Sequence, residues 1–234
     1  MNIYKEAFRL NQFDRIEKYL LLIKKYPHII NGLNELEIIT DKDTLYREQE
    51  NLYCAADIKN QPRDWYDLGI VAQDAWVVVI RDLVRFPNGK YGGYIRILNR
   101  RSQLEQSGKD VVVLVKIDSK FLLMKHFRHD DRLWHWECPR GYGEQNLSPR
   151  ENALKEIQEE TGLTVNSIQQ LDDNNERVAY FVVDCSGDVC NSDKYENISE
   201  TILVDIDEFK NMIADCKIDD MYTLRAFILY ELKR

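Results

Sequence analysis

The chain contains no uninterrupted apolar run of the roughly 20 residues that a membrane-spanning helix requires. The apolar stretch at residues 20–23 is short and is followed at once by Lys24 and Lys25. The first ten residues, MNIYKEAFRL, also lack the pattern of a secretory signal peptide. From these absences we expect a cytoplasmic protein without a membrane partner.

Basic residues are fewer than acidic residues in this chain, and cysteines are few. The 32 lysines and arginines face 40 aspartates and glutamates, and the net charge of −8 argues against a general nucleic-acid-binding surface. The five cysteines are odd in number and irregularly spaced, which favours free thiols in a reducing compartment over a disulfide framework. Cys185 and Cys190 bracket a short loop, but no second pair completes a zinc site.

Residues 1–69 have the pattern of a small helical module. The spacing of apolar residues predicts one helix that ends at Pro27 and a second helix over residues 43–58. The side chains expected to face inward are Phe8, Phe13, Ile16, Leu20 and Ile23 in the first helix, and Leu45, Leu52 and Ala56 in the second. We interpret the module as a cap or dimerisation element; a substrate lid or partner-binding domain is the alternative.

Residues 70–234 combine strand and helix patterns. The apolar content of the chain, 44%, suffices for one good core and a smaller element. Apolar runs predict strands over residues 110–116, 120–125, 178–184 and 201–206, with helices over 207–215 and 222–232. Strands interleaved with helices that cover a mixed sheet predict an α/β sandwich.

A helix with clear start and stop signals is predicted between Ser148 and Gly162. Ser148 is the expected N-cap, Pro149 lies where a missing N–H costs nothing, and Glu151 completes a capping box. Gly162 fits a left-handed position after the last turn. The preceding loop at residues 139–143 contains two glycines that permit close approach of a ligand, and the free N–H groups of the helix start favour phosphate.

Three glutamates, Glu156, Glu159 and Glu160, share one face of this helix because positions three and four apart are neighbours. Like charges at that spacing cost about 0.2–0.5 kcal/mol per pair in an isolated helix. A divalent cation between them would turn the repulsion into attraction, and ligation by oxygen alone suits Mg²⁺ or Mn²⁺. A solvated helix face that binds nothing is the alternative.

The segment from Gly141 to Leu163 resembles the Nudix box, G-x5-E-x7-R-E-U-x-E-E-x-G-U, where U is a bulky aliphatic residue. The positions in register are Gly141, Glu156, Ile157, Glu159, Glu160, Gly162 and Leu163. Two positions depart from the pattern: Leu147 replaces the first glutamate, and Lys155 replaces an arginine that orients the catalytic glutamates in the family. Lysine keeps the charge but loses the planar fork of arginine.

Four short segments outside the box resemble elements of the ADP-ribose pyrophosphatase-like group of this family. Each match is weak alone, and their order along the chain carries the resemblance. They lie at residues 82–90, 126–128, 136–139 and 217–224. The resemblance covers residues 70–234 and implies a Nudix-type α/β/α sandwich with a mixed sheet, preceded by residues 1–69 as a helical extension. It leaves a homodimer open.

The resemblance also implies roles for individual residues. Glu156 and Glu160 would be the main metal ligands, and Glu159 would assist or orient water. The backbone carbonyl of Arg140 would be a further ligand. A catalytic carboxylate is expected from the loop before the late strand, where Glu196 is the better match and Glu200 the second. An ordinary solvated glutamate is the alternative reading of that loop.

Four residues are candidates for substrate binding: Arg128, Glu137, Arg140 and Gly141. Arg128 is a candidate phosphate contact because guanidinium binds phosphate bidentately. An arginine that only pairs with a core carboxylate is the alternative. By the resemblance, Glu137 would contact ribose or base.

Two classes of function follow. The first is a hydrolase dependent on Mg²⁺ or Mn²⁺ that cleaves the pyrophosphate bond of a nucleoside diphosphate linked to another moiety, with ADP-ribose or a related nucleotide sugar favoured. The second is a Nudix-like nucleotide-binding or regulatory protein in which Leu147 and Lys155 mark relaxed catalysis. The three retained glutamates favour the enzyme.

Overall fold

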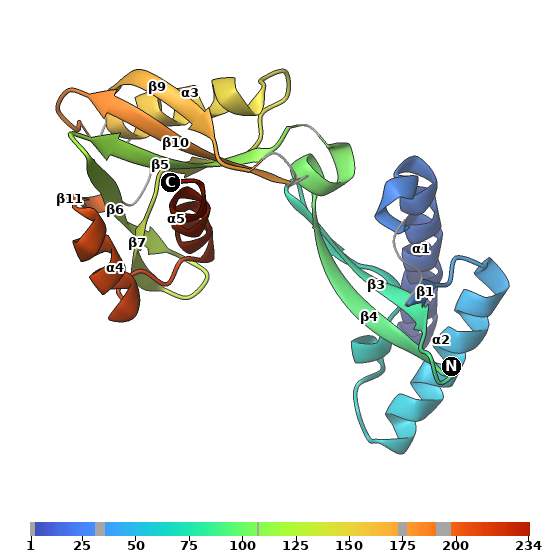
Figure 1. The fold of residues 1–234 in the computed structure, drawn as a ribbon. Helices are drawn as coiled ribbons and strands as arrows, with labels where there is room; N and C mark the ends of the chain where they lie inside the picture. Colours follow the sequence, from blue (N-terminus) through green and yellow to red (C-terminus); the bar gives the residue numbers. More distant parts are fainter. Residues whose placement is uncertain (1–2, 31–35, 107, 173–176, 191–197) are drawn as a thin grey trace. The chain divides into compact units, whose positions relative to one another are not determined.

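The chain folds into two units, Met1–Glu105 and Gln106–Arg234, each with a sheet of its own (Figure 1). The computed structural model describes residues 3–30, 36–106, 108–172, 177–190 and 198–234, with side chains from residue 14 onward. The boundary predicted from the sequence, between residues 69 and 70, lies earlier than this division. The two boundaries differ because the strands between residues 69 and 99 pair with one another and belong to the first unit.

The first unit contains the two predicted helices and also a sheet that the sequence did not predict there. The helices are α1 (Ile3–Lys25) and α2 (Lys42–Ile58), followed by short 3-10 turns at Pro27–Ile30 and Arg63–Tyr66. The strands are β1 (Glu37–Ile38), β2 (Gly69–Gln73), β3 (Val77–Arg85) and β4 (Tyr91–Asn99), and a π-helical turn follows at Arg100–Glu105. Strand β3 pairs antiparallel with each of the other three.

A buried carboxylate connects the helical and sheet layers of the first unit. Asp82 on β3 is 1% exposed and accepts hydrogen bonds from the hydroxyl of Tyr19 on α1 and from Nε of Arg96 on β4, both at 2.5 Å. Burial and the neighbouring Asp82 raise the pKa of Tyr19, so that its hydroxyl remains a donor. The predicted inward residues Ile16 and Leu45 are buried in the same core.

The second unit is built on a mixed sheet. Its strands are β5 (Asp110–Ile117), β6 (Lys120–Arg128), β7 (Leu133–Glu137), β8 (Arg140–Gly141), β9 (Thr164–Gln170), β10 (Val178–Ser186) and β11 (Ile198–Val204). The central order is β11-β6-β5-β10-β9, with β7 paired to β6 and β8 to β5. Only β5 and β10 pair in parallel among the described strands of this unit.

Helices cover both faces of this sheet, which confirms the predicted α/β sandwich (Figure 1). They are α3 (Pro149–Thr161), α4 (Ile206–Ala214) and α5 (Met221–Lys233). Alternate residues of β5 serve the two faces: Val111 and Val113 pack with α3, whereas Leu114 packs with α4 and α5.

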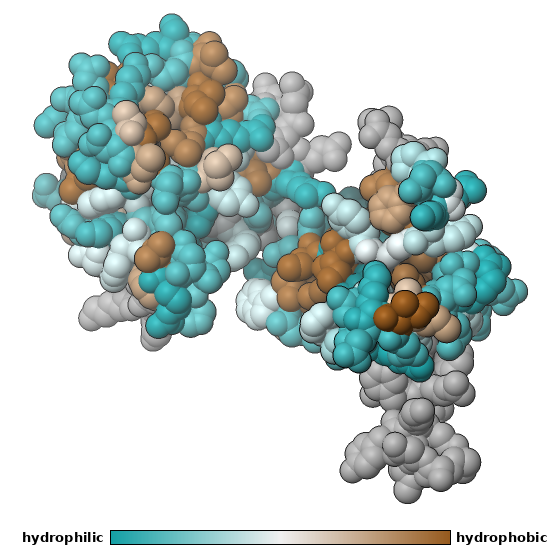
Figure 2. Space-filling view, turned by 90° about the horizontal axis from the view of Figure 1, so that it is seen from below, coloured by the Kyte–Doolittle hydropathy of each residue, from teal (hydrophilic) through white to brown (hydrophobic). Residues whose placement is uncertain are grey.

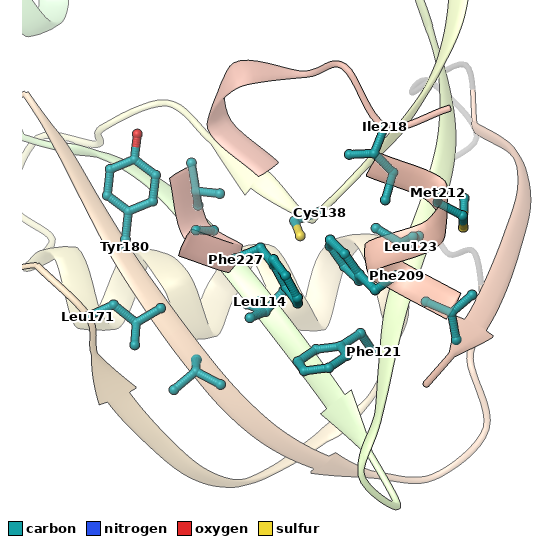
Figure 3. Packing of buried hydrophobic residues seen from close by; sticks show 14 of the residues in the cluster. Leu114, Phe121, Leu123, Cys138, Leu171, Tyr180, Phe209, Met212, Ile218 and Phe227 are labelled. Carbon is teal, nitrogen blue, oxygen red and sulfur yellow. The ribbon is translucent and has the colours of Figure 1, made fainter. Parts of the chain in front are cut away.

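The core under α4 and α5 is rich in aromatic rings (Figure 3). Phe209 of α4 stacks on Phe227 of α5 with ring centroids 4.2 Å apart, and Phe121 of β6 meets both rings edge to face. This packing fixes the C-terminal helices against the sheet and thereby positions the residues at the start of α5.

The exposed surface combines hydrophilic areas with apolar patches on the visible faces of both units (Figure 2). In the first unit Trp76, Ile95 and Ile97 have exposed side chains. No described helix is long and apolar enough to cross a membrane.

Candidate active site

Helix α3 has the capping structure that the sequence predicted. The hydroxyl of Ser148 accepts a hydrogen bond from the Glu151 N–H at 3.2 Å, and the Glu151 carboxylate accepts one from the Ser148 N–H at 2.8 Å. Gly162 adopts the expected left-handed conformation, with φ of 68°. Between these two ends, Ala153 and Ile157 are buried against β5 and β10 and form the side of the helix that faces the sheet.

The three glutamates of α3 divide into a buried pair and an exposed partner. Glu156 and Glu160, one helical turn apart, are 9% and 3% exposed, whereas the Glu159 side chain is 50% exposed. A fully solvated face would have exposed all three. Burying two carboxylates one turn apart is unfavourable unless positive charge or hydrogen bonds compensate it.

Gly141 lies directly against Glu156. Strand β8 pairs with β5 so that Gly141 is opposite Val111, and this register brings the glycine to the α3 face of the sheet. A Cβ at Gly141 would collide with the Glu156 carboxylate and would lie 2.6 Å from its Cγ. Only glycine therefore leaves room for the carboxylate in its present position.

The loop between β8 and α3 is tied to its surroundings by hydrogen bonds. The Tyr142 carbonyl accepts a bond from Nδ2 of Asn152 at 2.9 Å, and the Gly143 N–H donates to the Asp110 carboxylate at 2.8 Å. Partial burial raises the pKa of Asp110, while the Gly143 N–H acts in the opposite direction. The loop thus reaches the helix in a defined conformation.

Lys155, one of the two departures from the sequence pattern, lies between two carboxylates. Its Nζ is 2.5 Å from Oε1 of Glu144 and 3.3 Å from Oε2 of Glu159. The hydrogen bond to Glu144 is the main reason why the pKa of Lys155 is raised, and Glu159 adds to it. Leu147, the other departure, is half-buried, and its N–H donates to the Glu144 carbonyl at 3.4 Å.

The predicted substrate residues Arg128, Glu137 and Arg140 form one cluster. Glu137 is 2% exposed, and the Nε–H of Arg128 is shared between its two carboxylate oxygens, at 2.9 and 3.1 Å. The end of the same guanidinium donates a further hydrogen bond to Glu137. Arg140 approaches the same carboxylate at 3.2 Å. This geometry matches the alternative for Arg128, an arginine paired with a core carboxylate.

Arg140 is held on its other side by the start of α5. Its guanidinium is 3.1 Å from the Asp220 carboxylate and lies over the Tyr222 ring, 5.0 Å from the centroid. Asp220 is also the N-cap of α5, since its carboxylate accepts from the Thr223 N–H at 2.8 Å. The sequence analysis placed Asp220 and Tyr222 in the match at residues 217–224 but gave them no role in the site, although an Asp-x-x-Thr capping pattern marks Asp220.

Two histidines near this cluster have opposite electrostatic environments. Burial and the positive charges of Arg128 and Arg140 lower the pKa of His126 to about 4, so its imidazole is neutral at neutral pH. His135 instead hydrogen-bonds to Asp219 at 2.8 Å and to Asp131 at 2.7 Å, and these bonds raise its pKa.

The donors present fit a partly hydrated Mg²⁺ or Mn²⁺. Among the described residues no group of three His, Cys, Asp or Glu side chains is arranged to hold a metal ion. Mg²⁺, however, usually keeps several waters and takes only one or two carboxylates together with substrate phosphates. The buried side chains of Glu156 and Glu160 offer two carboxylates, which is the number that such a site requires.

Two predicted loop carboxylates remain to be placed. Glu196 lies outside the described residues. Glu200 is on β11 with its side chain 54% exposed, 3.8 Å from Nζ of Lys125. Its position agrees with an ordinary surface glutamate that makes a loose ion pair.

A family model described as NUDIX domain matches residues 107–222. A solved structure titled "Crystal structure of ADP compounds hydrolase" superposes with a TM-score of 0.53 at 15% identity, over 70% of this chain and 89% of that chain. The search of curated sequences found no match. At this identity the structural likeness concerns the fold alone.

Proposed function

Because the chain belongs to the Nudix hydrolase family, we propose that it hydrolyses the pyrophosphate bond of a nucleoside diphosphate linked to another moiety. ADP-ribose or a related nucleotide sugar is the favoured substrate, and Mg²⁺ or Mn²⁺ is the required ion. The ADP compounds hydrolase of similar fold supports the adenine nucleotide as the first candidate.

The observation that carries the proposal is the buried pair Glu156 and Glu160 beside the Gly141 backbone. At 9% and 3% exposure, two neighbouring carboxylates lose most of their hydration, which is unfavourable for folding. Packing of the helix against the sheet would be served equally well by apolar side chains at these positions. A divalent cation would offset the cost of this lost hydration, and glycine at the adjoining strand position leaves room for the Glu156 carboxylate that would hold it. The exposure of Glu159 is consistent with a role in assisting the other two or in orienting water.

Hydrolysis requires that the charge of the pyrophosphate oxygens be neutralised and that a water be aimed at phosphorus. A bound Mg²⁺ would supply Lewis acidity to phosphoryl oxygen and lower the pKa of its water. In our proposal Glu156 and Glu160 hold the ion, with the Arg140 carbonyl as a further ligand, and Glu159 orients the water. Glu196 is proposed as an additional catalytic carboxylate.

For substrate binding we propose Gly141, Arg128, Glu137 and Arg140. Gly141 allows close approach along the backbone of β8. The two guanidiniums remain 26% and 23% exposed while they bind Glu137, so a phosphate or ribose at the surface can approach both of them. Glu137 then serves to orient both arginines.

The test is product release from ADP-ribose, NADH, diadenosine polyphosphates and nucleotide sugars with Mg²⁺ or Mn²⁺. We expect turnover that is abolished by chelation and by Glu160→Gln. Glu208→Gln, an exposed glutamate on α4, is the control and should retain full activity. Absence of turnover on every substrate, or full activity of Glu160→Gln, contradicts the assignment and favours the nucleotide-binding alternative.

We also propose a cytoplasmic homodimer. The five free cysteines support a reducing compartment, and the exposed apolar side chains Ile95 and Ile97 of β4 provide surface that a second copy could bury. Light scattering on the eluting protein measures the mass directly; a single chain of 27.7 kDa at micromolar concentration would contradict the dimer.

A further inference from the structure

We propose that Glu144 is a positioning residue that holds Glu159 in place through Lys155. The inference rests on the proposed function, since it concerns the helix that would carry the metal ligands. Lys155 Nζ bridges the two carboxylates, at 2.5 Å from Glu144 and 3.3 Å from Glu159. The lysine thereby connects the loop before α3 to the exposed glutamate of the helix.

The backbone of Glu144 is fixed by close packing. A Cβ at Gly108 would lie 2.7 Å from the Glu144 carbonyl oxygen, and a Cβ at Gly143 would lie 2.5 Å from the Gly108 carbonyl carbon. The adjacent Gly143 N–H is bonded to the Asp110 carboxylate of β5. The backbone of Glu144 therefore lies in a closely packed part of the loop that is tied to β5 by its neighbour Gly143.

The contact between Glu144 and Lys155 affects the side chain of Glu159. Glu159 is the one exposed member of the three glutamates and has the largest rotamer freedom to lose. Lysine four residues before glutamate is the less favourable order for an isolated helical pair. A second carboxylate that fixes the lysine in the bridging rotamer makes this pair persist, so the Glu159 side chain stays beside Glu156 and Glu160.

This bridge also accounts for the two departures from the sequence pattern. Leu147 removes the carboxylate expected six positions after Gly141, and Glu144 supplies one only three positions after it. Lys155 has a single ammonium group in place of the planar fork of arginine, so its carboxylate partners must lie close to that one nitrogen. Glu144 provides such a partner. The two changes are thus parts of one arrangement.

The test measures Mn²⁺ affinity by electron paramagnetic resonance and kcat on the best substrate, for Glu144→Gln, Lys155→Gln and the double variant. The sign of the Lys155→Gln effect is decisive. If Lys155 acted only through its charge, removing it would tighten Mn²⁺ binding, whereas Glu144→Gln would weaken it. A positioning role predicts that both single variants weaken Mn²⁺ binding and lower kcat, each by about two- to fivefold, with KM unchanged.

Further variants complete the experiment. The double variant should have the same Mn²⁺ affinity and kcat as the poorer single variant. Lys155→Arg should retain the wild-type kcat because the arginine fork can bridge both carboxylates. Glu231→Gln is the matched control: its carboxylate pairs with Lys210 at the same 2.5 Å, between α4 and α5, and its loss should change neither readout. Tighter Mn²⁺ binding in Lys155→Gln, or single effects that multiply, overturns the inference.

The readouts separate this inference from the proposed function. Turnover by the wild type with unaltered kcat in Glu144→Gln overturns the role of Glu144 alone. If the wild type turns over no substrate, the proposed function fails, and the Mn²⁺ titration still decides whether Glu144 positions Glu159 through Lys155. If the wild type binds no Mn²⁺, both are overturned.

Discussion

Replacing Gly141 by alanine adds a single methyl group at the point where β8 touches the buried glutamate pair. The new Cβ would collide with the Glu156 carboxylate and lie 2.6 Å from Cγ, whereas ordinary van der Waals contact begins at 3.4 Å. The glutamate side chain must therefore move by about 1 Å or more. All the colliding atoms belong to the outer part of one flexible side chain, so the backbone of β8 can stay in place.

The two consequences of this displacement differ in size. Rotation of one side chain to another rotamer costs about 1 kcal/mol of folding free energy or less. A misplacement of about 1 Å at a catalytic group costs about 100-fold in rate, which corresponds to about 2.7 kcal/mol of activation free energy. We therefore expect Gly141→Ala to be a folded protein with about one hundredth of the wild-type kcat.

The assay pairs steady-state kinetics with thermal unfolding, in a cycle with Glu156→Ala. In the Glu156→Ala background the collision disappears, so Gly141→Ala should cause no further loss of rate. Gly92→Ala is the matched control in the first unit, because its Cβ would meet the outer edge of the Phe86 ring at 2.7 Å, and its kcat should equal that of the wild type. Retention of more than a third of kcat by Gly141→Ala, or losses that multiply in the double variant, would refute the reasoning.

Three further changes test the charged groups of the two units. Glu137→Gln leaves two guanidiniums facing an uncharged amide and should lower the free energy of unfolding by about 2 kcal/mol, measured by urea denaturation; an unchanged midpoint would contradict this. The pKa of His135 is raised in the folded state, so its stabilisation is present below the unfolded pKa near 6.5 and is lost as pH rises through the folded value. His135→Gln should therefore reduce the loss of Tm on going from about pH 6 to pH 8.5, and a variant with the wild-type pH dependence would rule out that linkage. Tyr19→Phe removes a hydrogen bond to the buried Asp82 and should destabilise the first unit by about 1.5–3 kcal/mol, with the fluorescence or circular dichroism transition as readout; equal stability would argue against it.

The sequence predicted local structure well wherever short-range chemistry decides it. The cap at Ser148 and the left-handed Gly162 depend on residues within one turn of each other, and both are confirmed. The strands β5, β6 and β10 follow from apolar runs that are buried on both faces, and they occur within a few residues of the predicted ranges.

Pairing over long distances in the chain could not be predicted in the same way. Tyr19 and Asp82 are 63 positions apart, and nothing in their local sequence marks a buried bond between helix and strand. The assignment of β2–β4 to the first unit depends on such contacts. In the candidate site the same limit applies to Glu144, since its contact with Lys155 comes from the path of a loop without periodicity.

The aromatic core beneath α4 and α5 gives the protein an internal chemical reporter. Cys138 is 1% exposed within that core, and burial raises the pKa of its thiol, so the reactive thiolate is suppressed while the second unit stays folded. Cys54 and Cys216, one in each unit, are exposed and should react with iodoacetamide at once. The delay between that early labelling and the alkylation of Cys138, followed by mass spectrometry, then measures how often the second unit opens under native conditions, without any introduced probe.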